Sequence, residues 1–304
     1  MRRFASLALL TACASSACPE PTPESAGAET SPAAPLAELT MGHASGQFHT
    51  VPVRVNDETL TVAILDTGIG IELISGALCR RLECTIDGEF SGQRMSGQEV
   101  TVPLTRLDEL TVGGVTRRDV VAGVIDGNGF WPEPQIEAFV GLPFFADTPF
   151  TIDGPRRRLI VESPETAAQR ERSATAIDVR VRRHGPAIDL FVPLQLGEAA
   201  AEVMMDTGSQ TVILHPRYAD PLGIDLDGDG IRRREGRDET DNPFVRSYTT
   251  IEQPVSFVGT PEQAHAGLDV MFQEIIHDGL IGTDLLSRFV ITYDLPNDRI
   301  LVAR

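Results

Sequence analysis

Short apolar or alternating runs, separated by Gly, Pro and Asp, make up most of the chain after residue 35. Runs of this kind are typical of β-strands joined by tight turns. Two of them, Leu104–Val115 and Val120–Ile125, predict a hairpin that turns at Gly113-Gly114.

Helical patterns are few and short. One helix is expected over Ser75–Leu82, where Ser75 can act as the N-cap, and a weaker one near Pro216–Leu222. The polar stretch Glu162–Ser173 predicts a linker with some helix. The pattern therefore predicts a mainly β fold with a few short helices.

One set of sequence landmarks occurs twice. In each copy an apolar run ends in Asp-Thr-Gly, and the Gly of an apolar-apolar-Gly triplet follows 75 or 76 residues after the Asp. A later Asp lies 12 residues beyond that Gly in both copies, and an Arg lies 5 residues further on. This agreement indicates a duplicated unit with a period too long for a solenoid, so we expect two lobes related by a pseudo-twofold axis. The copies contain Ala63–Gly68 with Phe139–Gly141, and Val203–Gly208 with Leu280–Gly282.

The duplication and the composition together divide the chain into five segments. The region before the first copy is rich in Pro, Ser, Thr, Glu and Ala, which is typical of a flexible tether. We expect a signal peptide over 1–12, a tether over 13–35, an N-terminal lobe over 36–162, an interlobe linker over 163–175 and a C-terminal lobe over 176–304.

The N-terminus carries the pattern of an export signal. Basic Met1–Arg3 and apolar Phe4–Leu10 precede Leu10–Cys13 (LTAC), which resembles a bacterial lipobox. The resemblance implies that Cys13 is lipidated and anchors the protein to the bacterial cell envelope, facing the periplasm or the exterior. An ordinary signal peptide or a chance Cys is the alternative. No other apolar run approaches the ~20 residues that span a bilayer, so the lipid would be the only membrane attachment.

Charge excludes several classes of function. The 304 residues carry a net charge of -18, and all 26 basic residues other than His are Arg. An acidic protein repels the phosphate backbone, so we expect no nucleic acid as partner. A chain without Lys cannot form Schiff bases or a P-loop. The Cys and His residues show no zinc-like spacing, and we expect no cofactor and a monomer.

The paired Asp-Thr-Gly triplets resemble those of the aspartic peptidases of the retropepsin and pepsin kind. The resemblance covers about residues 36–304, with a retropepsin-like unit duplicated and fused in one chain. It implies two acid-protease-like β-barrel lobes with the active cleft between them, and aspartic endopeptidase activity. A single triplet would say little, because the sequence is common in loops.

Two carboxyl groups can hydrolyse an amide without a metal or a nucleophilic side chain. One carboxylate deprotonates a water while its protonated partner acts as the acid. Like charges about 3 Å apart do not both ionise easily, so such a pair retains one proton from acidic to near-neutral pH. The resemblance places this dyad at Asp66 and Asp206, and the sequence does not assign the proton to either.

The resemblance also assigns supporting residues. A Thr in each loop would bridge the two loops through hydroxyl-to-backbone hydrogen bonds, and a Gly would let backbone N–H groups approach the carboxylates. A small residue usually follows the triplet, and an apolar-Gly pair braces each loop from below. On this chain these are Thr67, Gly68, Val140 and Gly141 in the first copy, and Thr207, Gly208, Ser209, Ile281 and Gly282 in the second.

The expected substrate is an extended peptide in the interlobe cleft, held by main-chain hydrogen bonds and side-chain pockets. By position the covering flap is Phe90–Val102, whereas the corresponding Arg234–Tyr248 is polar enough to form a loop instead. Two features depart from the family: Ile69 follows the first triplet, and neither flap segment has a Tyr before Tyr248. They leave open a pseudo-peptidase that binds peptides or acts as a scaffold without cutting.

Two candidate sites are weaker. Asp225, Asp227 and Asp229 resemble the start of a calcium loop, but the following residues depart from the EF-hand pattern, which favours a solvated acidic turn. Cys79 and Cys84 flank the end of the expected Ser75 helix and could form a disulfide in an oxidising compartment.

The remaining charged groups suggest no site. Arg156–Arg158 and Arg232–Arg234 are short runs for which a solvated surface is expected. His43 and His184 recur at matched positions in the two copies, and we expect them to have a structural hydrogen-bonding role.

Overall fold

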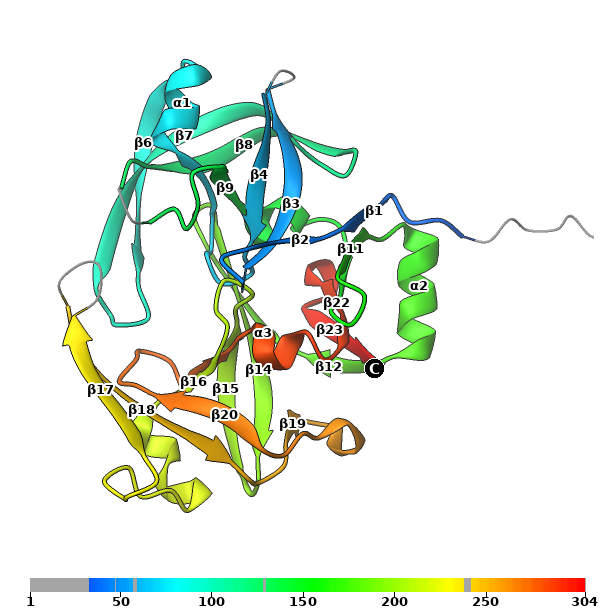
Figure 1. The fold of residues 1–304 in the computed structure, drawn as a ribbon. Helices are drawn as coiled ribbons and strands as arrows, with labels where there is room; N and C mark the ends of the chain where they lie inside the picture. Colours follow the sequence, from blue (N-terminus) through cyan, green and yellow to red (C-terminus); the bar gives the residue numbers. More distant parts are fainter. Residues whose placement is uncertain (1–32, 47, 57–58, 128–129, 238–241, 304) are drawn as a thin grey trace, which may run out of the picture. The chain divides into compact units, whose positions relative to one another are not determined.

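The computed structural model describes residues 33–46, 48–56, 59–127, 130–237 and 242–303. The predicted mainly β fold is confirmed, with strands in three sheets and short helices between them (Figure 1). The α-helices are α1 (Gly76–Arg81), α2 (Pro164–Ser173) and α3 (Thr283–Leu286). The 3-10 helices are η1 (Leu142–Phe145), η2 (Pro216–Tyr218), η3 (Asp220–Leu222), η4 (Pro261–Gln263) and η5 (Leu295–Asn297).

The first large sheet belongs to the N-terminal half of the chain. Its strand order is β2-β3-β4-β9-β5-β8-β7-β6, and β3 also pairs with β7. The strands are β2 (Gly42–Ala44), β3 (Phe48–Val55), β4 (Thr59–Leu65), β5 (Glu72–Ser75), β6 (Ile86–Gln93), β7 (Glu99–Val112), β8 (Val115–Ile125) and β9 (Ile136–Val140).

The second large sheet belongs to the C-terminal half. Its strand order is β13-β14-β15-β21-β16-β20-β18-β17, and β19 pairs with β14. The strands are β13 (Arg180–His184), β14 (Ala187–Leu196), β15 (Ala199–Met205), β16 (Val212–Leu214), β17 (Arg232–Arg237), β18 (Pro243–Ile251), β19 (Val255–Phe257), β20 (Leu268–Phe272) and β21 (Gly279–Ile281).

The two large sheets repeat the same pairing pattern. In the first, β4 pairs with β9 in parallel, β9 with β5 antiparallel and β5 with β8 in parallel. In the second, β15, β21, β16 and β20 pair in the same order with the same orientations. Each sheet ends in an antiparallel hairpin, β6–β7 or β17–β18. Equivalent sequence landmarks therefore lie on equivalent strands.

A third sheet takes strands from both halves, in the order β1-β11-β10-β22-β23-β12. At its centre β10 pairs with β22, with Thr151 opposite Thr292 and their Oγ1 atoms 2.7 Å apart. In Figure 1 this sheet and α2 lie on the right, away from the two hairpins on the left. The strands are β1 (Ala37–Thr40), β10 (Phe150–Asp153), β11 (Arg158–Val161), β12 (Thr175–Asp178), β22 (Val290–Asp294) and β23 (Arg299–Ala303).

Buried apolar side chains form one main core through both halves and two smaller clusters. Side chains alternate along β4 and β15, so Leu65 and Met205 enter the main core while Ile64 and Met204 face the smaller clusters. The N-terminal apolar cluster is Ala44, Ile64, Ile71, Leu73, Ile136, Phe139 and Ala187. The C-terminal apolar cluster is Phe191, Met204, Ile213, Met271, Ile275 and Leu280.

Most local predictions are confirmed. The β7–β8 hairpin turns at Gly113 and Gly114, whose φ angles of 60° and 93° suit glycine. Ser75 caps α1 by accepting the N–H of Leu78 at 2.9 Å. The weaker helix near residue 216 is two 3-10 turns, and the polar linker is helical from Pro164 onward.

Candidate active site

Asp66 and Asp206 each follow the end of a central strand, β4 and β15. The N–H of Asp66 donates to the carbonyl of Val140 at 2.9 Å, and that of Asp206 donates to the carbonyl of Ile281 at 3.0 Å. Val140 and Ile281 end β9 and β21, which pair in parallel with β4 and β15. Each acidic loop is thus fixed to the strand beside it.

A reciprocal hydrogen-bond network joins the two loops. The Thr67 hydroxyl donates to the carbonyl of Met205 at 2.8 Å and accepts the N–H of Thr207 at 3.1 Å. The Thr207 hydroxyl donates to the carbonyl of Leu65 at 2.8 Å and accepts the N–H of Thr67 at 3.0 Å. Both threonines are 1% exposed, so water cannot replace these partners. The network therefore ties the two acidic loops rigidly together.

The glycines of the two triplets make room for the carboxyl groups. The N–H of Gly68 donates to Asp66 Oδ1 at 2.8 Å, and that of Gly208 donates to Asp206 Oδ1 at 2.9 Å. A Cβ on Gly68 would lie 2.5 Å from the Cγ of Asp206, and one on Gly208 would lie 2.2 Å from Asp66 Oδ2. Any side chain at either position would displace the opposite carboxyl group.

The two carboxyl groups lie together and hydrogen-bond each other. Burial raises the pKa of Asp206 well above its ordinary value, and the neighbouring charge of Asp66 raises it further. Burial also raises the pKa of Asp66, although backbone N–H donors oppose the rise. These shifts favour a pair that retains a proton above the ordinary titration range of Asp.

The residue after each triplet contributes its backbone to the site. The backbone N–H of Ile69 lowers the pKa of Asp66, and that of Ser209 lowers the pKa of Asp206 while donating to the Asp206 main-chain carbonyl at 3.3 Å. The Ile69 side chain packs against the N-terminal apolar cluster, where its Cγ2 faces Gly141. The Ser209 hydroxyl donates to the carbonyl of Thr211 at 3.4 Å. Ile69 therefore keeps the backbone contact that Ser209 makes in the second loop.

Glu72 is a supporting residue that the sequence analysis missed. It is 1% exposed, and its two carboxyl oxygens accept the N–H groups of Gly141 and Phe144, both at 2.9 Å. Burial raises its pKa to about 8, and the two N–H donors oppose the rise. The available signal was a single acidic residue inside the apolar run Ile69–Ser75. Glu72 holds the segment that follows the Val140 carbonyl.

The first hairpin, β6–β7, reaches across to the C-terminal half. At its tip the carbonyl of Met95 accepts the N–H of Ile276 at 2.9 Å, and Gln98 accepts the side-chain amide of Asn242 at 2.6 Å. The Met95 side chain packs against the C-terminal apolar cluster. The segment expected to be the flap is therefore a hairpin in contact with the opposite half, with Met95 at its tip.

The second hairpin settles a point that the sequence left open. Arg234–Tyr248 is polar enough for a loop, but β17 and β18 pair in register from Arg232 opposite Tyr248 to Arg237 opposite Pro243. Aromatic side chains beneath arginines stabilise this polar hairpin, since the Arg246 guanidinium lies 3.9 Å from the Phe244 ring centroid. Each large sheet thus extends a hairpin.

The possible disulfide is not formed in the structure, where Cys79 and Cys84 are free thiols. Burial and the hydrogen bond with Cys84 raise the pKa of Cys79 to about 12. The thiolate needed for disulfide exchange is therefore disfavoured at Cys79. The backbone N–H of Cys84 instead donates to the Cys79 carbonyl at 3.0 Å after the end of α1.

The acidic turn does not assemble a calcium site. An Asp225 carboxyl oxygen accepts the N–H of Asp227 at 3.0 Å, and the Asp227 carboxylate pairs with Arg233 at 3.4 Å. Asp229 joins no cluster, because the described residues contain no group of three or more His, Cys, Asp or Glu that could hold a metal. This arrangement agrees with the solvated acidic turn that the sequence favours.

The matched histidines have different surroundings. The His43 ring centroid lies 5.4 Å from that of His49, whereas the His184 ring lies 5.9 Å from that of Phe90 on the first hairpin. Cys13 and the predicted segment 1–12 lie outside the described residues, as does most of 13–35. Across the described part, no helix combines the length and the apolar character needed to cross a membrane.

Comparison with known families bears on the first acidic loop and its surroundings. Residues 51–144 match the aspartyl protease family. The matched stretch contains Asp66, Glu72, the first hairpin and the brace at Val140. No curated protein matches the chain significantly. The match supports a general aspartic protease function for this part of the chain.

Proposed function

We propose that the protein is an aspartic endopeptidase in which Asp66 and Asp206 hydrolyse a peptide bond. The observation that carries the proposal is the pair of carboxyl groups, Asp66 buried and Asp206 half-buried, beside the reciprocal Thr67 and Thr207 network. One carboxyl group of each half is placed beside the other, and neither half alone contains the pair.

In this reaction the ionised carboxylate accepts a proton from water as the water oxygen attacks the peptide carbonyl carbon. The protonated partner donates its proton to the carbonyl oxygen, which gives a tetrahedral diol. The diol then collapses: one of its hydroxyls returns a proton to the ionised partner carboxylate, the C–N bond breaks, and the leaving nitrogen takes the proton that came from the water. The raised pKa values of Asp66 and Asp206 suit a pair that holds one proton at near-neutral pH.

We also propose that the two halves are copies of one retropepsin-like unit, each supplying one acidic loop to a single cleft. The identical pairing order of the two large sheets supports this, as does the placement of Thr151 opposite its repeat mate Thr292. An extended peptide would lie between the halves under the β6–β7 hairpin, and one chain would be sufficient for activity.

The test is cleavage of a peptide library by the purified protein at several pH values, with products identified by mass spectrometry. Asp66→Asn and Asp206→Asn should each abolish cleavage, because each removes one member of the pair. Asp220→Asn, at an exposed Asp in η3, is the matched control and should retain it. Full activity of either dyad variant would refute the proposal.

A protein that binds peptides but cuts none would be the pseudo-peptidase alternative. The contact of Ile69 with the N-terminal apolar cluster argues against it, because the side chain does not take the place of the backbone donor. Isothermal titration with uncleaved library peptides separates the two outcomes.

We further propose a lipid anchor at Cys13 that holds the protein at the cell envelope, facing the periplasm or the exterior. Metabolic labelling with an acyl probe should mark the protein and fail with Cys13→Ser. A Cys13→Ser protein that still partitions with membranes would contradict the anchor.

A further inference from the structure

Arginine and aromatic side chains gather on one face of the second hairpin. Residues directly opposite each other in antiparallel strands share a face, and so does every second pair along them. We name this surface the cationic face. Its pairs are Arg232 with Tyr248, Arg234 with Arg246, and Gly236 with Phe244.

The guanidinium groups of the cationic face lie against aromatic rings. Arg232 lies 4.5 Å from the ring centroid of Tyr248, and Arg246 lies 3.9 Å from that of Phe244. Arg234 lies 5.9 Å from the same Phe244 ring. These contacts orient the arginines without neutralising them.

The arginines of the cationic face differ from the arginine on the opposite face of the same hairpin in whether they form ion pairs. There Arg233 forms ion pairs with Asp227 and Glu235. Among the described residues, Arg232, Arg234 and Arg246 form no ion pair with a carboxylate. Arg246 Nε donates to the side-chain oxygen of Gln273 at 2.9 Å, which is a neutral partner. In a chain of net charge -18, three arginines on one face without a carboxylate partner are a strong local departure from the rest of the composition.

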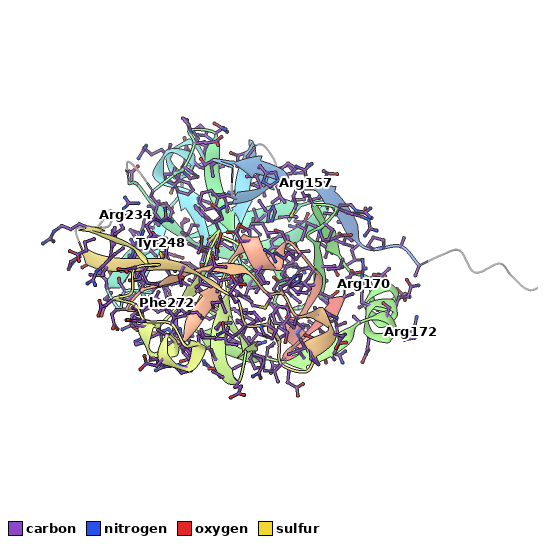
Figure 2. The ribbon with its side chains drawn as sticks, turned by 60° about the horizontal axis from the view of Figure 1, so that its bottom comes forward. Arg157, Arg170, Arg172, Arg234, Tyr248 and Phe272 are labelled. Atoms are coloured by element: carbon purple, nitrogen blue, oxygen red, sulfur yellow. The ribbon has the colours of Figure 1, made fainter. Side chains whose placement is uncertain are left out.

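The cationic face borders a buried apolar cluster that adjoins the Asp206 loop. Tyr248 packs against the C-terminal apolar cluster, which also contains Met204, two residues before Asp206. Met95 of the first hairpin packs against the same cluster. Figure 2 shows Arg234 and Tyr248 together on this hairpin, with Arg172 of α2 far to the other side.

We propose that the cationic face is a subsite for an acidic side chain of the peptide substrate, on the Asp206 side of the cleft. The inference rests on the proposed function and names its substrate class. Carboxylates form charge-assisted hydrogen bonds with guanidinium groups, and Arg234 and Arg246 are opposite each other and can act on the same carboxylate. Apolar neighbours of that acidic residue would contact Met95 and Tyr248 at the edge of the C-terminal apolar cluster.

An anionic lipid surface is the other ligand class that such arginines could attract. A peptide fits better, because the cationic face shares its apolar border with the Asp206 strand and with the first hairpin.

The test measures peptide binding apart from cleavage. Fluorescein-labelled decapeptide libraries with Glu or Gln fixed at each position in turn are titrated against the Asp206→Asn variant by anisotropy. At one or two positions Glu should bind more tightly than Gln, by roughly two- to five-fold for each arginine engaged. The preference should disappear at about 1 M NaCl, where charges are screened within roughly 3 Å.

Arg234→Gln and Arg246→Gln, made in the same background, should each reduce the Glu preference and leave the affinity for Gln peptides unchanged. Arg172→Gln, at an exposed arginine of α2, is the matched control and should keep it. Melting temperatures verify that each variant is folded.

An equal Glu preference in all variants, or none in any, would overturn the subsite. Binding to phosphatidylglycerol vesicles that falls with Arg234→Gln, beside an unchanged peptide preference, would assign the face to lipid and also overturn it. Absence of cleavage by the unaltered protein would refute the proposed activity while the binding result still decided the subsite.

Discussion

Replacing Thr207 by Val should strongly destabilise the protein. Val keeps the shape of Thr but removes the hydroxyl, which leaves the Leu65 carbonyl and the Thr67 N–H without their partners. Each buried unsatisfied group costs about 1–3 kcal/mol, so the free energy of unfolding should fall by about 2–6 kcal/mol. That is a large share of the ~5–15 kcal/mol typical of a folded domain.

Urea unfolding followed by fluorescence measures this loss. The single Trp of the chain, Trp131, packs against the N-terminal apolar cluster, so its fluorescence reports when unfolding exposes that cluster to water. Thr207→Ser should recover most of the stability because it restores the hydroxyl. Thr249→Val, at a half-buried strand position with no side-chain hydrogen bond recorded in the described structure, should change stability by less than about 0.5 kcal/mol. A loss below about 1 kcal/mol for Thr207→Val would refute the role of the network.

Three further predictions concern Gly68 of the first acidic loop and two buried titratable residues, His49 and Glu72. Gly68→Ala should reduce peptide cleavage at least ten-fold with little change in secondary structure, because the new Cβ would lie 2.5 Å from the Asp206 Cγ; circular dichroism and steady-state kinetics check this. Burial lowers the pKa of His49 to about 4, so the stability that its neutral ring contributes should be lost as pH falls from about 6.5 through 4. In an acid titration, His49→Gln should therefore unfold at a lower pH than the unaltered protein. Burial raises the pKa of Glu72 to about 8, so the stability that its protonated carboxyl contributes should be lost as pH rises from about 4.5 through 8. Glu72→Gln should therefore give a flatter curve of unfolding free energy against pH over that range.

Each of these has a result that would contradict it. An unaltered rate for Gly68→Ala would mean that the loop yields without moving the carboxyl group. An unchanged acid midpoint for His49→Gln would show that neutral burial of this ring does not limit acid stability. A Glu72→Gln curve as steep as that of the unaltered protein would assign the alkaline loss to another group.

Local sequence signals predicted much of the fold. Two consecutive glycines specify a turn in which both residues have positive φ, so Gly113 and Gly114 fix the β7–β8 hairpin without help from distant residues. Ser75 likewise needs only its own helix to act as a cap. The repeated Asp-Thr-Gly landmarks marked two loops that the hydrogen bonds of Thr67 and Thr207 join in the structure.

The features that sequence did not predict depend on distant partners. Glu72 binds the backbone of Gly141 and Phe144, and nothing in its local pattern specifies those donors. The contact of Met95 with Ile276 likewise depends on the placement of a whole hairpin against the opposite half. The sequence left open whether the second hairpin was a loop, because its polar composition does not reveal that strand pairing stacks arginines on aromatic rings.

The central claim, that Asp66 and Asp206 share one proton and cleave peptides, is tested most directly by the pH dependence of kcat/KM. A bell-shaped profile is predicted whose upper apparent pKa lies well above the ordinary range of Asp, because burial raises the pKa of both carboxyl groups. Asp66→Asn and Asp206→Asn should show no cleavage at any pH. Cleavage that persists in either variant, or a profile with no descending limb on the alkaline side, would contradict the claim.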